Sequence, residues 1–526
     1  IGISDRAIAP YTPVEIEHDL SSVSVLGRRI SVGQLGLPSG IRSSFDDRCR
    51  LDGDADPIEL LAAPISLSVK ADGENLPVSQ LGDARLTPGG EAEATVSRTA
   101  ECGGLRLDSE ITYECDGHID CMIRVRAESA GEYSFELCLP VRTGAAPYMM
   151  GMCREGGRVP NFWEYTWDRA HHGALVWLGG ARAGIQLKLM PEDERWGHSL
   201  PFPRLWYNGG RGGMRLRTSH EHGVIDLRAF TGNVHLDEGD EEVLHFHLIV
   251  TPFHPVDYNT HWTEHYYQKN SWHSDEPIPS LENAKKFGTK TVILHQGGPL
   301  NENINYPFVL APKLKAEVDR AHAMGLYYKI YYTVRELSNY TTEIWALRAL
   351  GDEIFYTGED FHIADFFMAD ADKKVRKRPR GGPWLIEHLV EGFTAAWHQF
   401  LQNGEYDCAI ATQHKSRWHN YYLAGLDWLC RVVGIDGIYL DGIGYDRHIM
   451  RRVRRVIMDA KGRCDIDIHC GNTHAEVYGQ GVSACHYLEH FAYADNIWNG
   501  EGYEYNSESP ESQLIEVSGL TFGVMG

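Results

Sequence analysis

The stretch "GIDGIYLDGIGYDRH" (434–448) joins an apolar strand directly to an acidic residue, Asp441. Ile438, Tyr439 and Leu440 are typical of a buried strand, and Asp441 stands at its carboxyl end. In a parallel sheet covered by helices, the carboxyl ends of the strands form the face that carries active sites. We therefore predict that the carboxylate of Asp441 lies in the mouth of an active site.

Other strand-like segments of the same half also end in polar residues. A single polar residue after a strand is ordinary for a loop, but a set that recurs at successive strand ends is typical of a binding site. The candidates at these ends are His295, Arg335, Glu387, His469 with Asn472, and Glu501.

Glycoside hydrolysis requires two carboxylates that flank one pocket. One attacks or stabilises the anomeric carbon, and the other, kept protonated, delivers a proton to the leaving oxygen. Asp441 suits the first role because it is short and fixed at a strand end. Glu501, in "DNIWNGEGYEY", suits the second, because its aromatic neighbours are expected to raise its pKa by excluding water. Glu489, in "HYLEHFAYAD", is the alternative acid and a further candidate for substrate binding.

Sugar pockets are lined by aromatic rings and flat hydrogen-bonding groups, and the chain holds 13 Trp, 26 Tyr and 26 His. Trp384 and Trp498 lie close to the candidate strand ends, and Arg417 joins the set of substrate-binding candidates. Arg447 is expected to orient a carboxylate or a sugar hydroxyl. Asp446 is expected to stabilise the start of the following helix through the helix dipole.

The stretch "DIDIHCGNTH" offers His469, Cys470 and His474 as metal ligands. Their spacing fits no closed zinc site, and histidines at strand ends bind sugars as readily. The sequence therefore predicts neither a metal nor a cofactor, with a metal-dependent hydrolase as a minor alternative.

From residue 286 onward, apolar strands alternate with amphipathic helices, which requires a parallel sheet covered by helices. About seven candidate strands and no Gly-rich nucleotide fingerprint favour a (β/α)8 TIM-type barrel over a doubly wound sheet. "GPWLIEHL" and "YDCAIAT" are among these strands, and Asp441 ends the fourth. The last unit or two of the barrel is expected to lie beyond the end of this chain.

Residues 1–255 show short alternating strands separated by Gly, Asp and Asn turns, as in "LRLDSEITYECDG" and "VLHFHLIVTPF". This pattern predicts an antiparallel β-supersandwich. Between 256 and 285, Pro, Asn, Ser and aromatic residues crowd together without a clear period, so we assign a connector there. The predicted chain is thus multidomain, β plus α/β, with a sandwich at 1–255, a connector at 256–285 and a barrel at 286–526.

The net charge of −23 disfavours binding to nucleic acid or to an anionic membrane. The eleven cysteines include no CxxC pair, which predicts free thiols and favours the cytoplasm, with a periplasmic or secreted location left open. A carbohydrate is the expected partner. A homo-oligomer is a second expectation, because large enzymes of this layout often associate.

"GIDGIYLDGIGYDR", "SRWHNYYLAGLDWL", "DIHCGN" and "YLEHFAYADNIWNGEGYEY" together resemble a group of bacterial glycoside hydrolase-like proteins. The amino-terminal sandwich of that group is classed with glycoside hydrolase family 123. The order of domains is also similar to that of the retaining α-galactosidase clan, which has an Asp after barrel strand four and an acid/base carboxylate after strand six. That resemblance implies Asp441 as nucleophile and Glu501 as acid/base. The clan's lysine-containing nucleophile motif is absent, and Tyr439-Leu440-Asp441 stands in its place.

Three functions remain open on this basis. The clan implies a retaining exo-α-glycosidase that acts on galactosides or N-acetylgalactosaminides. Family 123 implies a β-N-acetylhexosaminidase in which an adjacent Asp-Glu pair assists the acetamido group of the substrate. The pair in the barrel half, Asp352-Glu353, stands at what looks like the start of a strand, which is a poor position for this role. The third function is non-catalytic carbohydrate binding, against which the presence of both Asp441 and Glu501 argues.

Overall fold

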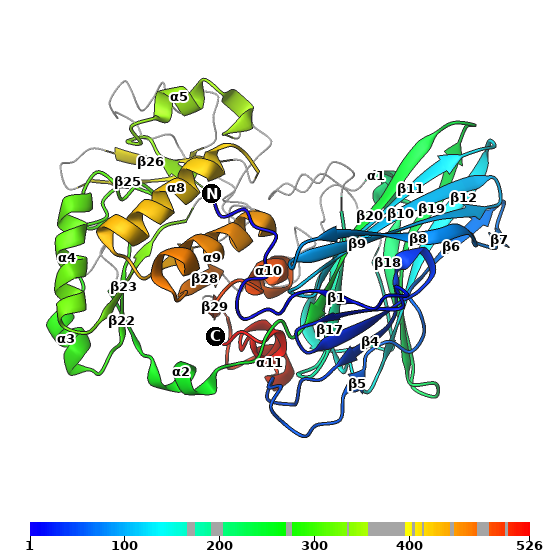
Figure 1. The fold of residues 1–526 in the computed structure, drawn as a ribbon, viewed down its shortest axis with the longest axis horizontal. Coiled ribbons are helices and arrows are strands. Elements are labelled where there is room, and N and C mark those ends of the chain that lie inside the picture. The colour runs from blue at the N-terminus through cyan, green and yellow to red at the C-terminus, as the bar shows by residue number, and fades with distance from the viewer. Residues whose placement is uncertain are drawn as a thin grey trace.

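The computed structural model describes residues 1–165, 174–190, 204–269, 276–333, 336–355, 395–401, 406–412, 415–441, 446–470, 483–499 and 503–526. Antiparallel sheets form one half of the molecule, and a parallel sheet with its helices forms the other (Figure 1). Helices α10 and α11 and the N-terminal segment lie between the two halves (Figure 1).

Two large sheets make the sandwich, and their facing side chains share one hydrophobic core. The strands alternate between buried and exposed residues, as in β10, which suits a sheet with one face on a core. The nine-stranded sheet contains, in order, β14 (Arg154–Arg158), β13 (Tyr148–Gly151), β16 (Leu175–Gly179), β17 (Gly184–Leu189), β20 (Glu241–Thr251), β11 (His118–Ala127), β10 (Leu105–Glu114), β9 (Glu93–Cys102) and β8 (Ser79–Gly89). The six-stranded sheet contains β15 (Phe162–Tyr165), β18 (Gly213–Ser219), β19 (Val224–Leu236), β12 (Gly131–Arg142), β6 (Ser66–Ala71) and β7 (Glu74–Leu76).

A smaller five-stranded sheet adds apolar residues to the same core. It contains β1 (Glu15–Ile16), β2 (Ser22–Val25), β3 (Arg28–Val32), β4 (Pro38–Ser43) and β5 (Ile58–Glu59). A short helix, α1 (Arg204–Tyr207), contacts β19 and β20. The antiparallel sandwich that the alternating pattern predicts is confirmed.

The second half is built on a parallel sheet, six strands of which lie in the described residues. They are β21 (Tyr266–Lys269), β22 (Thr291–Leu294), β23 (Tyr327–Tyr331), β27 (Gly437–Asp441), β28 (Ile466–Cys470) and β29 (Asn496–Asn499). The sheet is curled so that its first and last described strands, β21 and β29, come together. Asn496 Nδ2 on β29 donates a hydrogen bond of 2.8 Å to the Tyr266 hydroxyl on β21. The TIM-barrel class is confirmed.

The order of strands differs from the expected order in two places. The segment "YDCAIAT" is not a barrel strand: it forms β26 (Tyr406–Ala411), which pairs antiparallel with β24 (Glu336–Ser338) and β25 (Ala395–Phe400). An apolar run of six residues fits either kind of sheet, so its period could not decide between them. Conversely, β21 lies within the stretch assigned as a connector, yet it pairs in parallel with β22. Asp441 is still on the fourth strand, but by a different count.

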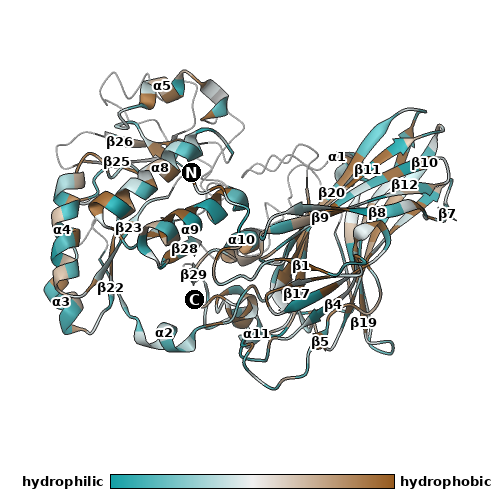
Figure 2. Cartoon of the chain, in the orientation of Figure 1, coloured by the Kyte–Doolittle hydropathy of each residue, from teal (hydrophilic) through white to brown (hydrophobic). Residues whose placement is uncertain are grey.

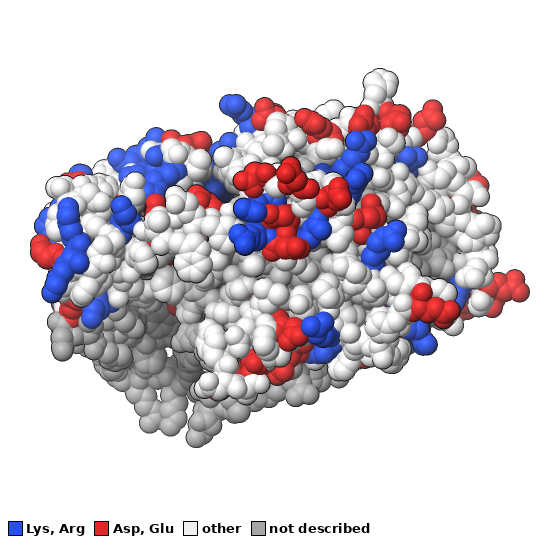
Figure 3. Space-filling view, turned by 90° about the horizontal axis from the view of Figure 1, so that it is seen from below, with Lys and Arg blue, Asp and Glu red and all other residues white. Residues whose placement is uncertain are grey.

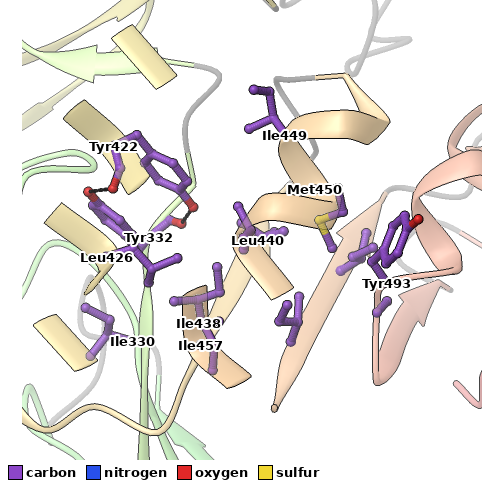
Figure 4. Close-up of a cluster of buried hydrophobic side chains, with 14 of the residues drawn as sticks. Ile330, Tyr332, Tyr422, Leu426, Ile438, Leu440, Ile449, Met450, Ile457 and Tyr493 are labelled. Atoms are coloured by element: carbon purple, nitrogen blue, oxygen red, sulfur yellow. Dashed lines mark hydrogen bonds between the residues drawn. The ribbon is translucent and has the colours of Figure 1, made fainter. Parts of the chain in front are cut away.

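Helices cover the outside of the parallel sheet, and α9 is amphipathic, with brown and teal residues alternating along it (Figure 2). Ile330, Ile438 and Leu440 of the strands pack with Leu426 of α8 and Met450 of α9 in one buried cluster (Figure 4). The helices in this half are α2 (Tyr258–Thr263), α3 (Leu281–Lys286), α4 (Ala311–Ala323), α5 (Ile344–Arg348), α8 (Trp418–Trp428), α9 (Arg447–Lys461), α10 (Ser483–Phe491) and α11 (Pro510–Glu516).

The face of the molecule seen in Figure 3 carries acidic and basic side chains interspersed, without a continuous field of one sign. Within the described part of the chain, every helix is too short or too polar to cross a membrane. Ten cysteines are described there as free thiols, most of them buried.

Candidate active site

Strand β27 places Asp441 by simple alternation. Successive side chains on a strand point to opposite faces, so Ile438 and Leu440 point outward into the helix layer while Tyr439 and Asp441 point into the barrel. The strand ends at Asp441, at the carboxyl-end edge of the sheet. Its carboxylate therefore lies in the barrel mouth, with 33% of the side chain exposed.

Two neighbouring strands hold the Asp441 carboxylate in place. Tyr331, at the end of β23, donates its hydroxyl to Asp441 Oδ2 over 3.2 Å. His469, on β28, places Nδ1 3.1 Å from Asp441 Oδ1. The parallel register aligns Asp441 with His469 across β27 and β28. Both partners lie on strands that pair with β27, so they orient the carboxylate.

Aromatic rings line the interior around and beneath this carboxylate. The Tyr439 ring stacks on His469 with centroids 5.9 Å apart and meets Trp498 edge-on at 6.0 Å. His295 lies 4.8 Å from the Tyr331 ring. Burial lowers the pKa of His295, although the nearby Asp441 opposes that shift. The mouth thus combines an acid, two imidazoles and stacking surfaces, which are the groups that bind sugars.

A charged layer lies deeper in the barrel. Lys329 Nζ, fully buried, is 2.8 Å from Asp467 Oδ2 and contacts Asp465, and it stands 4.5 Å from the Tyr266 ring centroid. Burial opposes the charge of Lys329, but the two carboxylates raise its pKa above the usual range. Burial raises the pKa of Asp465 to about 7, against the effect of Lys329. This layer joins β21, β23 and β28 below the mouth.

The structure brings four of the predicted residues together at the mouth: Asp441, His469, His295 and Trp498. Asp446 caps helix α9, accepting a 3.0 Å hydrogen bond from the Ile449 amide, so the structural role expected for it is confirmed. Five predicted residues lie outside the described part of the chain, namely Arg335, Trp384, Glu387, Asn472 and Glu501.

Two candidates are corrected, because both are engaged with the sandwich. The Arg447 guanidinium is buried between the carboxylates of Glu114 and Asp116, where it cannot orient a sugar. Glu489 is 4% exposed and accepts a 2.8 Å hydrogen bond from Lys188 Nζ. Burial raises the pKa of Glu489, but Lys188 and the nearby His490 and His118 together outweigh burial and lower it to about 2, which is the opposite of what a proton donor needs.

Two further candidates lie at the surface. Arg417, with 66% of its side chain exposed, pairs with Glu353. The segment 351–353 is a 3-10 turn rather than the start of a strand. Glu353 therefore stands in a surface turn and forms an exposed ion pair with Arg417.

Sequence reasoning missed Tyr331 as a partner of Asp441. The signal was present in "LYYKIYYTVRE", where alternation from Lys329 places Tyr331 on the inward face. Both faces of this strand carry apolar or aromatic residues, and either set fits a buried strand. The sequence pattern therefore did not show which face points into the barrel.

Comparison with known families covers both halves. Residues 257–526 match the model of the glycoside hydrolase 123 TIM-barrel domain, and residues 16–252 match the model of the glycoside hydrolase 123 third domain. No curated protein matches the sequence.

Solved structures similar to this chain include three α-galactosidases. One, a GH36 enzyme from Geobacillus stearothermophilus in complex with raffinose, is 10% identical with a TM-score of 0.39, covering 98% of this chain and 77% of its own. One from Lactobacillus brevis is 11% identical with a TM-score of 0.40, covering 98% and 75%. One from Thermus thermophilus in complex with stachyose is 11% identical with a TM-score of 0.32, covering 83% and 85%.

Proposed function

Because the chain belongs to glycoside hydrolase family 123 and is a glycosidase, we propose that it removes a terminal sugar from a glycan with retention of configuration. The observation that carries this proposal is the position of Asp441. Its carboxylate is fixed at a strand end in the barrel mouth, partly exposed, and held by Tyr331 and His469. A nucleophile needs this combination of access and fixed direction.

In the proposed first step, an Asp441 oxygen attacks the anomeric carbon while the bond to the leaving oxygen breaks. Glu501 gives that oxygen its proton. In the second step, Glu501 takes a proton from water as the water oxygen attacks the same carbon, and the bond to Asp441 breaks. Tyr331 and His469 hold the carboxylate before attack and receive it again afterwards.

Glu501 remains the proposed acid/base on the order of the strands. It follows β29 by two residues, and β28 alone separates β29 from β27. Strands two steps apart in a sheet are about 10 Å apart, so a carboxylate that follows β29 and one that ends β27 are candidates for the pair that retaining enzymes use. The commitment of Glu489 to Lys188 removes the rival acid.

A galactoside or N-acetylgalactosaminide of α configuration is the proposed substrate. Membership in family 123 supports a second candidate, a substrate-assisted β-N-acetylhexosaminidase. In that mechanism the acetamido oxygen of the substrate attacks, and Asp441 orients the acetamido N–H instead of bonding to carbon. Both candidates place Asp441 beside the anomeric centre, so they differ in bond formation and not in location.

The test is hydrolysis of a panel of aryl glycosides, α and β, with and without a 2-acetamido group, by wild type and Asp441→Ala. We expect release from an α-substrate and its loss in Asp441→Ala, by a factor of about 10⁴ or more. Asp427→Ala, which removes a partly exposed acid on α8, is the matched control and keeps its activity. Sodium azide separates the two mechanisms, because it replaces a missing carboxylate nucleophile and yields a glycosyl azide of inverted configuration.

Azide rescue of Asp441→Ala supports the covalent role. If wild type hydrolyses only 2-acetamido β-substrates and azide does not rescue Asp441→Ala, the second candidate, a substrate-assisted β-N-acetylhexosaminidase, replaces the first. Full activity of Asp441→Ala on any substrate removes Asp441 from the mechanism.

A further inference from the structure

A cluster of ionisable residues lies between the sandwich and the barrel, away from the barrel mouth. Strands β17, β20 and β11 are neighbours in the nine-stranded sheet, and their register aligns Lys188 and Asp120 with His247. His118 lies on the same face, two residues from Asp120. Helix α10 of the barrel half packs against this face and brings Glu489 to it (Figure 1).

Three of these residues have the geometry of metal ligands. One imidazole nitrogen each from His118 and His247 and one carboxylate oxygen of Glu489 lie within 4.8 Å of one another. The ligand atoms of a four-coordinate zinc ion are about 3.4 Å apart, so side-chain rotation of about an ångström closes the set. His118 and Glu489 are nearly inaccessible to solvent, with exposed side-chain fractions of 3% each, and 12% of His247 is exposed.

The second, independent observation is the lack of hydrogen bonds to the two imidazoles. His118 Nδ1 lies 3.2 Å from Glu114 Oε1 without hydrogen-bond geometry, and His247 Nε2 lies 3.6 Å from Asp120 Oδ1, which is hydrogen-bonded to His245. Their other nitrogens, His118 Nε2 and His247 Nδ1, are buried and have no hydrogen-bond partner among the described residues. Buried polar atoms are nearly always satisfied.

The charged residues around the cluster are compatible with a bound cation. Lys188 Nζ donates a hydrogen bond to Glu489 Oε1. The other carboxylate oxygen, Glu489 Oε2, lies 4.0 Å from His247 Nδ1 and can bind the ion. Asp120 is hydrogen-bonded to His245, and Glu114 is paired with Arg447.

We propose that His118, His247 and Glu489 bind one Zn²⁺ ion, which joins helix α10 of the barrel to the outer face of the nine-stranded sheet. Two imidazoles and a carboxylate suit zinc better than Mg²⁺ or Ca²⁺, which prefer oxygen ligands. The ion satisfies both orphan nitrogens, and a water molecule completes its coordination. Its role is to hold the two halves together, and it takes no part in hydrolysis.

The test uses the full chain, freed of metal with EDTA and then equilibrated with ZnCl₂. We expect one Zn²⁺ per chain by mass spectrometry of the dialysed protein and a thermal midpoint raised by several degrees, since a ligand of the folded state stabilises it. His118→Asn and His247→Gln lose both effects. His235→Gln, which changes an exposed histidine of the same half, keeps both.

Failure to retain zinc, or equal zinc binding in wild type and both variants, overturns the proposal. If His118→Asn fails to fold, His247→Gln decides, because its side chain is less deeply buried. None of these measurements depends on hydrolysis, so the outcome is independent of the proposed substrate.

Discussion

Asp441, the proposed nucleophile, is positioned by few contacts. Its position comes from one strand, and its orientation comes from the Tyr331 hydroxyl and the His469 imidazole on the two adjacent strands. Because the three groups sit on paired strands, their spacing is set by the ladder and not by a loop. Sites held on strands are positioned more tightly than sites held on loops.

Tyr331→Phe tests the hydroxyl that holds Asp441. The change removes one hydrogen bond to a charged group, and such bonds contribute about 1.5–3 kcal/mol, so we expect kcat to fall about 10- to 100-fold while the fold is retained. The measurement is steady-state kinetics on whichever substrate the wild type accepts. Tyr328→Phe makes the same change on the same strand, but in the core beneath the helices, and should leave kcat unaltered. Equal losses in both variants would mean that the hydroxyl acts through stability alone.

Strand β27 depends on close contact with the segment before β28. A Cβ added at Gly437 would lie 2.0 Å from the carbonyl oxygen of Asp465, so only glycine permits the approach. This contact also fixes the register of β28 against β27, and hence the alignment of His469 with Asp441. The close packing at Gly437, where β27 begins, therefore helps to set the position of Asp441, where β27 ends.

Gly437→Ala should separate the two strands. We expect a loss of about 3 kcal/mol in the free energy of unfolding, as for other overpacked cores, together with a lower kcat. Urea denaturation and kinetics measure both effects. Gly144→Ala is the control, since no atom lies within 4 Å of its Cβ. A fully stable, fully active Gly437→Ala would show that β27 and β28 adjust freely.

At the scale of the molecule, sandwich and barrel are joined by buried charges. Arg447 of α9 lies between Glu114 and Asp116 at the end of β10, and Lys188 of β17 lies against Glu489 of α10. Buried charges are tolerated only in pairs, because each alone pays a large desolvation penalty. The two halves therefore stabilise one another.

Arg447→Met should destabilise the whole chain, because Asp116 loses its buried cation, while Glu114 keeps Arg451. Removing one partner of a buried pair is worth about 3–5 kcal/mol. The urea midpoint measures the loss, and Arg431→Met, which breaks an exposed pair on the same half, should move it little. A midpoint no lower than that of the control would mean that water enters the interface.

Glu516 of α11 predicts a pH dependence of the same interface. It is 3% exposed and accepts a hydrogen bond from the Gly156 amide on β14. Burial raises its pKa from 4.5 to about 7. Because folding favours the protonated form, its stabilising effect is complete below pH 4.5 and is lost as the pH rises through 7.

Glu516→Gln should therefore flatten the stability profile in that window. Wild type is expected to lose on the order of 1 kcal/mol per pH unit relative to the variant between pH 5 and 7. Thermal unfolding at several pH values measures this, with Glu504→Gln, at an exposed position, as control. Parallel profiles for wild type and Glu516→Gln would show that the carboxylate is solvated when ionised.

The sequence by itself determined the class of each half and the position of Asp441. Both follow from local periods: alternation predicts the sandwich, apolar strands between amphipathic helices predict the barrel, and an acid directly after such a strand predicts a residue in the mouth. His295 and His469 were predicted by the same rule, since strand ends of a parallel sheet converge at one edge, whereas Trp498 was predicted from its aromatic ring close to those ends.

Only the tertiary structure decided what depends on contacts between distant segments. Arg447 and Glu489 carry the same local signals as true site residues, yet the sandwich neutralises them, and no period in the barrel half reveals a partner in β10 or β17. The pairing of β26 with β24 and β25, and the hydroxyl of Tyr331 on Asp441, were hidden for the same reason. Periodicity shows which face of a helix or strand is buried, but only the fold shows which segment packs against that face.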